Sequence, residues 1–429
     1  MSTDSSSDSL VNDCIERLQA RGFDRCQVRE TSSQKHELQA EFNVPSMLRT
    51  VNNRTLQLSG IVDAKRASCS LNKVDSDSID AAVAQLWDSA LAAPADDAND
   101  ISAAQDQQSF ASSCLEPDLD KMCDRLDEFL DHTNSTFPSV TLGVAGISHA
   151  VATQRYANSN GVLFDSRDGC YSAQAMFTAR DEKDVSSFSY SGVSTRALDR
   201  PVAECASFDR LMANAVAQVR TQKVPQKFVG DLIITPDCLG SFIGFLLNNI
   251  GSGPMISGTS IYKGRLHEQV AADALTIRSL PCDMPSGYFV TDDGYPSENG
   301  VVVENGKLQT YLLDLYASRK TGFERTQTGG CYEVAPGDVP FETMLGDVKQ
   351  GVLISRFSGG RPSEKGDFSG VAKNSFYIED GEVRQPISET MVSGNLAALL
   401  MDIDAVSIET VHFGSSHYPW VKVSNIGVS

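Results

Sequence analysis

The sequence has few basic residues, few histidines and no long apolar run. Its 36 Lys and Arg are outnumbered by 56 Asp and Glu, so the 429 residues carry a formal net charge of −20. A chain this acidic is poorly suited to neutralise a phosphate backbone or an anionic membrane face, so we expect neither nucleic acid nor membrane as a partner. No stretch of about 18 apolar residues is present to cross a bilayer. Because the N-terminus also lacks the basic and apolar regions of a secretory signal, we expect a cytoplasmic location.

Metal and nucleophile motifs are also scarce. The ten cysteines are scattered singly, without a Cys-x-x-Cys pair to hold zinc. His267-Glu268 begins like a zincin helix, but positions 271 and 272 are alanine, so no second imidazole follows one turn later. His412 and His417 are five residues apart in a strand-like segment, and this odd spacing predicts side chains on opposite faces. The motifs therefore provide no catalytic residue and no metal ligand.

Hydrophobic periodicity predicts an α+β fold of three units. Residues 1–98 have the pattern of a helix, short strands and a second helix. Residues 99–228 begin with a linker rich in Ala, Asp, Gln and Ser and continue as a middle α/β unit, in which Asn160-Gly161 predicts a hairpin turn. Residues 229–429 are rich in strand and turn patterns, which predicts a β-rich domain of mainly antiparallel strands with a helix near 238–250.

The most unusual local sequence runs from Ile354 to Pro362. A strand there enters paired glycines flanked by Arg356 and Arg361, which can approach a peptide backbone closely or bind a carboxylate. A tight loop packed against the sheet is the alternative interpretation. The candidate residues for contact with a peptide or a partner are Arg356, Phe357, Ser358, Gly359, Gly360, Arg361, Asp367, Phe368 and His417.

Several motifs in the C-terminal half resemble the TldD/PmbA family, and specifically its TldE (PmbA) branch. They are the segment 351–360, Gly366-Asp-Phe-Ser369, Phe376-Tyr-Ile-Glu-Asp-Gly381, Pro386-Ile-Ser-Glu389 and Ser393-Gly-Asn-Leu396, preceded by Asp292-Asp-Gly294, Glu304-Asn-Gly306 and the segment 311–319. The N-terminal and middle units follow the family's order with weaker motifs. The resemblance implies a cytoplasmic two-subunit peptidase system, long labelled a modulator of DNA gyrase, that acts on unfolded or small peptides.

The resemblance also implies where zinc would lie. In that family, the TldD-type subunit carries a His-Glu-x-x-x-His helix, and a cysteine near the C-terminus completes its zinc site. The matching helix here, 237–250, contains no His or Glu, and the stretch 414–420 contains no cysteine. The resemblance therefore implies a non-catalytic TldE/PmbA-like subunit that is inactive alone, has no cofactor of its own and depends on zinc in a TldD-type partner.

Three functions remain open at this point. The first is the non-catalytic TldE/PmbA-like subunit, which forms a heterodimer with a TldD-type metallopeptidase and binds an extended peptide by β-augmentation. The second is a metallopeptidase or other hydrolase with a non-obvious site, for which His412, His417, Asp402 and Asp404 are the candidate ligands. The third is a homodimeric protein that binds peptides without any protease. An acidic chamber wall would favour neutral or basic peptides.

Overall fold

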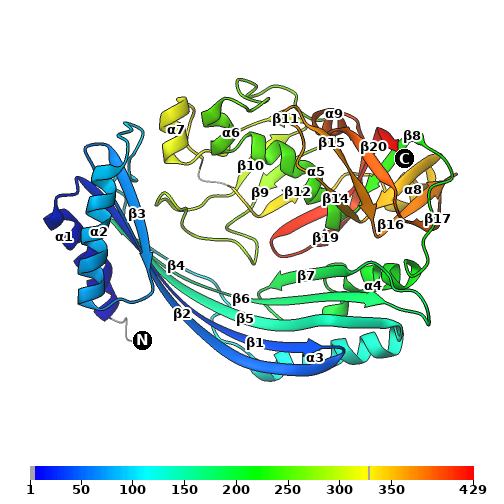
Figure 1. The fold of residues 1–429 in the computed structure, drawn as a ribbon, viewed down its shortest axis with the longest axis horizontal. Helices are drawn as coiled ribbons and strands as arrows, with labels where there is room; N and C mark the ends of the chain where they lie inside the picture. Colours follow the sequence, from blue (N-terminus) through cyan, green and yellow to red (C-terminus); the bar gives the residue numbers. More distant parts are fainter. Residues whose placement is uncertain (1–4, 327–328) are drawn as a thin grey trace.

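The computed structural model describes residues 5–326 and 329–429, which form two large sheets (Figure 1). The N-terminal half builds a seven-stranded sheet, and the C-terminal half builds a 13-stranded sheet. Helices cover parts of both sheets. The predicted α+β class is confirmed.

One continuous sheet runs through the whole N-terminal half. Its elements are α1 (Ser5–Arg21), β1 (Arg25–Glu41), β2 (Val44–Val62), β3 (Lys65–Leu71), α2 (Ser76–Ala92), β4 (Gln108–Ala111), α3 (Leu119–Thr136), β5 (Val140–Asn158), β6 (Leu163–Ala179), β7 (Ser189–Thr195), the short 3-10 helix η1 (Val202–Glu204) and α4 (Phe208–Ala217). The strand order is β3-β2-β1-β5-β6-β4, with β7 beside β6. Because β1 pairs with β5 from Gln27↔Asn158 to Ala40↔Ala145, the expected units 1–98 and 99–228 share this sheet.

Two separate cores lie at the two ends of the same sheet face. Val28 packs with the apolar stripes of α1 and α2, whereas Leu38, ten residues further along β1, packs with those of α3 and α4. Even spacing along a strand keeps side chains on one face, so both helix pairs cover the same side of the sheet. The boundary expected at residue 98 stays a prediction.

The C-terminal half is β-rich, as predicted. Its elements are β8 (Phe228–Ile234), α5 (Pro236–Asn249), α6 (Ser252–Ser257), β9 (Ile277–Ser279), β10 (Gly300–Glu304), β11 (Lys307–Leu308), α7 (Leu315–Thr321), β12 (Tyr332–Val334), α8 (Phe341–Gly346), β13 (Gln350–Ile354), β14 (Arg356–Gly359), β15 (Asp367–Lys373), β16 (Ser375–Glu379), β17 (Glu382–Ile387), β18 (Met391–Asn395), α9 (Leu396–Met401), β19 (Ile403–His412) and β20 (Ser416–Val428). Most strand pairs are antiparallel, and β8 with β13 is one parallel exception. The buried faces of α5 and α9 share one large apolar core with the strands.

The C-terminal domain lies on the concave side of the curved N-terminal sheet (Figure 1). At one end of the contact, Arg29 donates to the carbonyl of Thr291 at 2.7 Å. At the other end, Arg356 donates to the carbonyl of Phe188 at 2.9 Å, just before β7. None of the described helices is both long enough and apolar enough to span a bilayer.

Candidate functional site

A pocket of about 460 Å³ lies between α5 and the end of β14. Ser241 and Phe242 line it from α5, and Leu396 lines it from the start of α9. Six of the nine residues predicted from sequence also line it: Phe357, Ser358, Gly359, Gly360, Arg361 and Phe368. The structure therefore brings together most of the predicted contact residues.

Three phenylalanines form the floor of this pocket. The ring of Phe357 lies 5.6 Å from that of Phe242 and 5.7 Å from that of Phe368, measured between ring centroids. Phe357 also covers two glycines that face each other across β14 and β15. A Cβ at Gly359 or Gly370 would lie 2.5 or 2.3 Å from the Phe357 ring, so the ring fits only because both residues are glycine. The two glycines therefore leave room for the Phe357 ring in the floor of the pocket.

Arg361 lines both this pocket and a second one of about 590 Å³. The second pocket is lined from α5 by Gly244, Phe245 and Asn248, and it shares Ser241 with the first. Arg361 is exposed and makes no hydrogen bond or ion pair with any described residue. We call the two pockets and Arg361 together the α5 groove.

Two of the predicted residues shape the surroundings of the α5 groove without lining it. The Asp367 carboxylate accepts hydrogen bonds from Asn395 and Ser363, at 2.9 and 3.0 Å, and these bonds lower its pKa. Asp367 therefore closes the loop that carries Arg361. Arg356 lies over the Phe188 ring at 4.1 Å, and burial lowers the pKa of its guanidinium. Its contacts join the two halves of the chain.

His417 lies away from the α5 groove, and its placement corrects one expectation. His412 and His417 are directly opposite each other on β19 and β20, with ring centroids 5.3 Å apart. The prediction that they face opposite sides is wrong, because a turn between them reverses the chain and makes them cross-strand neighbours. His417 contacts Glu333 at 3.1 Å and Thr410 at 2.7 Å. Burial lowers the pKa of His412, which favours the neutral imidazole.

The four candidate ligands of the metallopeptidase alternative do not form a cluster. Asp404 is eight residues from His412 along β19, which corresponds to about 26 Å in a strand. Asp402 instead accepts a hydrogen bond from Asn425 at 3.3 Å. Within 5–326 and 329–429, no three His, Cys, Asp or Glu side chains are placed to hold a metal ion.

Comparison with known proteins finds a family likeness in the C-terminal part of the chain. Residues 228–429 match the model described as the PmbA/TldA metallopeptidase C-terminal domain. Over this C-terminal region, the chain is similar to the TldD/PmbA family. The chain is 27% identical to Metalloprotease PmbA of Escherichia coli O157:H7, over 63% of this chain and 62% of that relative. The chain spans between 42% and 62% of the length of the first curated relatives it matches.

Two solved structures share the whole fold of this chain. A Bacteroides thetaiotaomicron protein named for modulation of DNA gyrase superposes with a TM-score of 0.87 at 19% identity, and the match covers 100% of both chains. TldE from Thermococcus kodakarensis superposes with a TM-score of 0.82 at 17% identity, over 99% of this chain and 100% of that one. Both sheets and their arrangement therefore recur in these two structures.

The residues of α5 do not fit zinc, which the TldD/PmbA resemblance places on the corresponding helix of TldD-type subunits. The α5 face toward the groove presents Ser241, Gly244, Phe245 and Asn248, none of which is a preferred zinc donor. Asp237 is held by an ion pair with Arg210. Cys238 is buried, and its burial raises the pKa of the thiol well above the usual range, so the thiolate that zinc requires is disfavoured.

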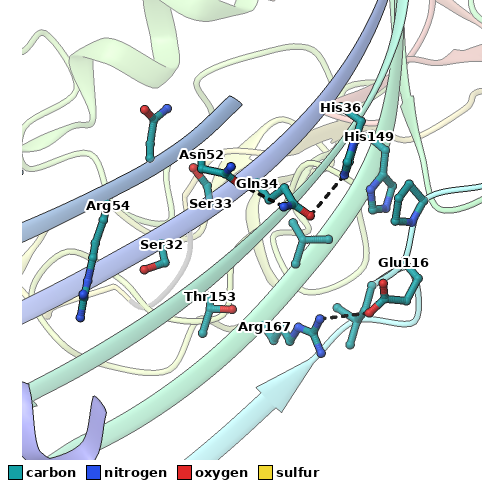
Figure 2. Close-up of a pocket in the computed structure, with 14 residues that line it drawn as sticks. Ser32, Ser33, Gln34, His36, Asn52, Arg54, Glu116, His149, Thr153 and Arg167 are labelled. Carbon is teal, nitrogen blue, oxygen red and sulfur yellow. Dashed lines mark hydrogen bonds and ion pairs between the residues drawn. The ribbon is translucent and has the colours of Figure 1, made fainter. Parts of the chain in front are cut away.

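A further hollow of about 460 Å³ lies on the helix-bearing face of the N-terminal sheet. Figure 2 shows His36 and His149 among the residues that line it. His36 and His149 are cross-strand partners in it. Burial lowers the pKa of His149, whose Nε2 contacts the Cys114 carbonyl at 3.2 Å and whose Nδ1 has no partner in the described chain. Sequence reasoning missed this pair because the two histidines meet only through the β1–β5 register.

Proposed function

We propose that the chain is a non-catalytic, cytoplasmic TldE/PmbA-like subunit that binds peptides for a TldD-type zinc metallopeptidase. The observation that carries this proposal is the α5 groove. It combines an apolar floor, a cation (Arg361) that is unpaired among the described residues and open main chain at Gly360, but it has no zinc donors on α5. This arrangement suits holding a peptide and does not suit activating water on a metal.

Main-chain contacts supply one part of the proposed binding. Among the described residues β14 pairs with β15 alone. The first part of its other edge lies against α5. The later part, from Ser358 to Gly360, borders the pocket. An extended peptide can therefore add to this edge over two or three residues, which is a short form of β-augmentation.

The proposal is tested by purifying the chain alone and together with a TldD-type partner. We expect the isolated chain to contain no stoichiometric zinc and to cleave no peptide, and the mixture to cleave unfolded peptides. Elemental analysis and hydrolysis of a quenched fluorescent peptide provide the two measurements. Stoichiometric zinc together with cleavage by the isolated chain would contradict the proposal and favour an enzyme in its own right.

The partner itself needs a separate measurement. Size-exclusion chromatography of the mixture should show a complex larger than either chain alone. A stable homodimer that never exchanges its subunits with the partner would instead favour a homodimeric peptide-binding protein. Salt adds a further check, since net charge of −20 should make capture of basic peptides weaker as ionic strength rises.

A further inference from the structure

Arg361 lines both pockets and makes no ion pair with any described residue, although the exposed Glu364 also lines the second pocket. Lys365, in the same loop, is also exposed but lines neither pocket. A guanidinium presents a planar fork of N–H donors that matches a carboxylate in a bidentate geometry. Arg361 is therefore placed to bind an anionic group that enters the groove.

The main chain beside Arg361 offers further donors. The amide N–H groups of Gly360 and Arg361 make no hydrogen bond with any described group. Gly360 has open space around it, since a Cβ there would meet no atom within 4 Å. A ligand can approach this backbone without moving any side chain.

The first pocket offers an apolar surface within reach of the same cation. The Phe242, Phe357 and Phe368 rings form its floor, and Leu396 lines it as well. Phe242, Phe368 and Leu396 are themselves buried, so the half-buried Phe357 ring supplies most of this surface, and a side chain that it partly covers gains less than the roughly 1.5–3 kcal/mol of full burial. An anion and an apolar side chain are therefore favoured at adjacent positions.

We propose that the α5 groove binds the C-terminal residue of a peptide. The terminal carboxylate contacts the Arg361 guanidinium and a neighbouring main-chain N–H, and an apolar terminal side chain lies on the phenylalanine floor. Of the parts of a peptide, only its C-terminus combines a main-chain carboxylate with a side chain on the same Cα. The inference rests on the peptide-binding role proposed above and adds its substrate class, namely peptides with a free, apolar C-terminus.

The direct test compares two labelled peptides that differ only at the terminus. Both have the same unfolded sequence and end in Phe, one as the free acid and the other as the amide. Fluorescence anisotropy with the full-length chain should show the amide binding about tenfold more weakly, because a charge-assisted hydrogen-bond pair is lost. Arg361→Gln should remove this difference, whereas the control Lys365→Gln should keep it. Equal affinity for acid and amide in the unaltered chain, or a preserved difference in Arg361→Gln, would overturn the inference.

Gly360→Leu tests whether the binding occurs in this pocket. The new side chain meets no neighbour at its Cβ, so the fold should be kept, but it occupies the pocket and should weaken binding of the acid peptide at least tenfold. An unchanged thermal unfolding curve provides the control. If Gly360→Leu blocks both peptides while acid and amide bind equally, the groove binds peptides but the carboxylate contact is wrong. If neither peptide binds the unaltered chain, both the inference and the peptide-binding role fail.

Discussion

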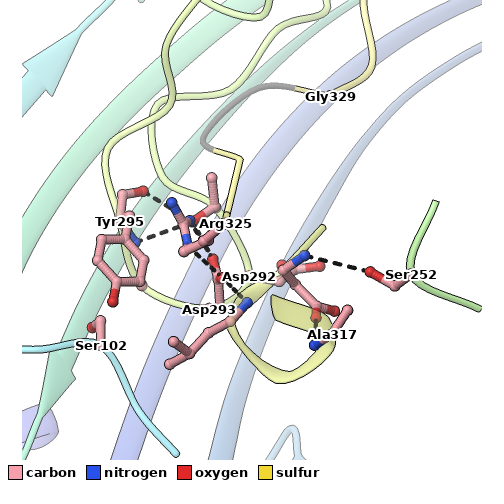
Figure 3. A network of polar contacts seen from close by, with 12 residues as sticks. Ser102, Ser252, Asp292, Asp293, Tyr295, Ala317, Arg325 and Gly329 are labelled. Atoms are coloured by element: carbon pink, nitrogen blue, oxygen red, sulfur yellow. Dashed lines mark hydrogen bonds and ion pairs between the residues drawn. The ribbon is translucent and has the colours of Figure 1, made fainter. Parts of the chain in front are cut away.

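Two arginines in loops of the same domain have opposite surroundings. Arg325 is 12% exposed, and its guanidinium makes a bidentate pair with Asp293 at 2.7 and 2.8 Å while it lies 3.7 Å above the Tyr295 ring (Figure 3). Arg361 is exposed at the edge of two pockets and has no partner among the described residues. The Arg325 guanidinium is engaged in structural contacts, whereas the Arg361 guanidinium is available to a ligand.

The Asp293 network has a clear structural consequence. The Asp293 carboxylate also accepts hydrogen bonds from the Thr291 hydroxyl and the Leu315 amide, so it joins a loop to the start of α7. α7 in turn carries Tyr316, whose hydroxyl donates to Asp96 at 2.8 Å in the N-terminal half. The paired arginine therefore supports the contact between the two halves of the chain.

The largest effect is expected from Arg325→Met. It leaves Asp293 buried without its counter-charge, which typically costs about 3–5 kcal/mol of the free energy of unfolding. Urea or guanidinium unfolding at pH 7 measures this loss. A loss below 1 kcal/mol would show that Arg325 is as dispensable to the fold as Arg361, and the contrast between the two would disappear.

The pH dependence of the same pair gives a second signature. Burial acts to raise the pKa of Asp293, but hydrogen bonds from Arg325 and Thr291 outweigh it and lower the pKa. The stabilisation is therefore present above the unfolded pKa of about 3.9 and is lost as pH falls through the lower folded value. In Arg325→Met, burial dominates and raises the pKa, so the variant should instead lose stability as pH rises. Unfolding measured between pH 3 and 7 checks the sign.

A smaller loss is expected from Gly370→Ala. The added methyl group would lie 2.3 Å from the Phe357 ring, and overpacking of this kind costs about 1–3 kcal/mol. Gly360→Ala is the matched control, because its Cβ meets nothing within 4 Å. Thermal unfolding of both variants measures the difference. Equal midpoints would mean that the phenylalanine floor is not fixed by its glycines.

Gly244→Ala should make the protein slightly more stable. Gly244 lies within α5, and a Cβ there has no neighbour within 4 Å, so alanine should add about 0.5–1 kcal/mol through helix propensity. The midpoint of thermal unfolding should rise. A fall would indicate that α5 needs the flexibility of glycine.

The smallest effect is expected from Arg361→Gln. An exposed cation without a partner contributes little to stability, so the free energy of unfolding should change by no more than about 0.5 kcal/mol. Denaturant unfolding of Arg361→Gln and Arg325→Met under the same conditions compares the two losses in the free energy of unfolding. A loss above 2 kcal/mol would assign Arg361 a structural role and remove the basis for a ligand there.

The sequence was sufficient where the signal is local. The α+β class follows from periodicity, and the α5 groove follows in part from the unusual glycines and arginines around Gly360. The features that could not be predicted from the sequence depend on pairing between distant strands. His36 and His149 meet only because β1 and β5 are in register, and the predicted separation of His412 and His417 failed because their turn was not recognised. Asp293 lay in a motif used for the resemblance, but its partner Arg325 is 32 residues away.

The length of the β1–β5 ladder sets the distance between the two ends of the N-terminal sheet. Its main-chain bonds run without a break from Gln27 to Ala40, so the sheet cannot fold at its middle without losing them. The distance between its two ends, near Arg29 and near Phe188, is therefore set by the number of residues in the strands. Adding two residues to each strand would keep every side chain on its present face but move those ends about 7 Å further apart.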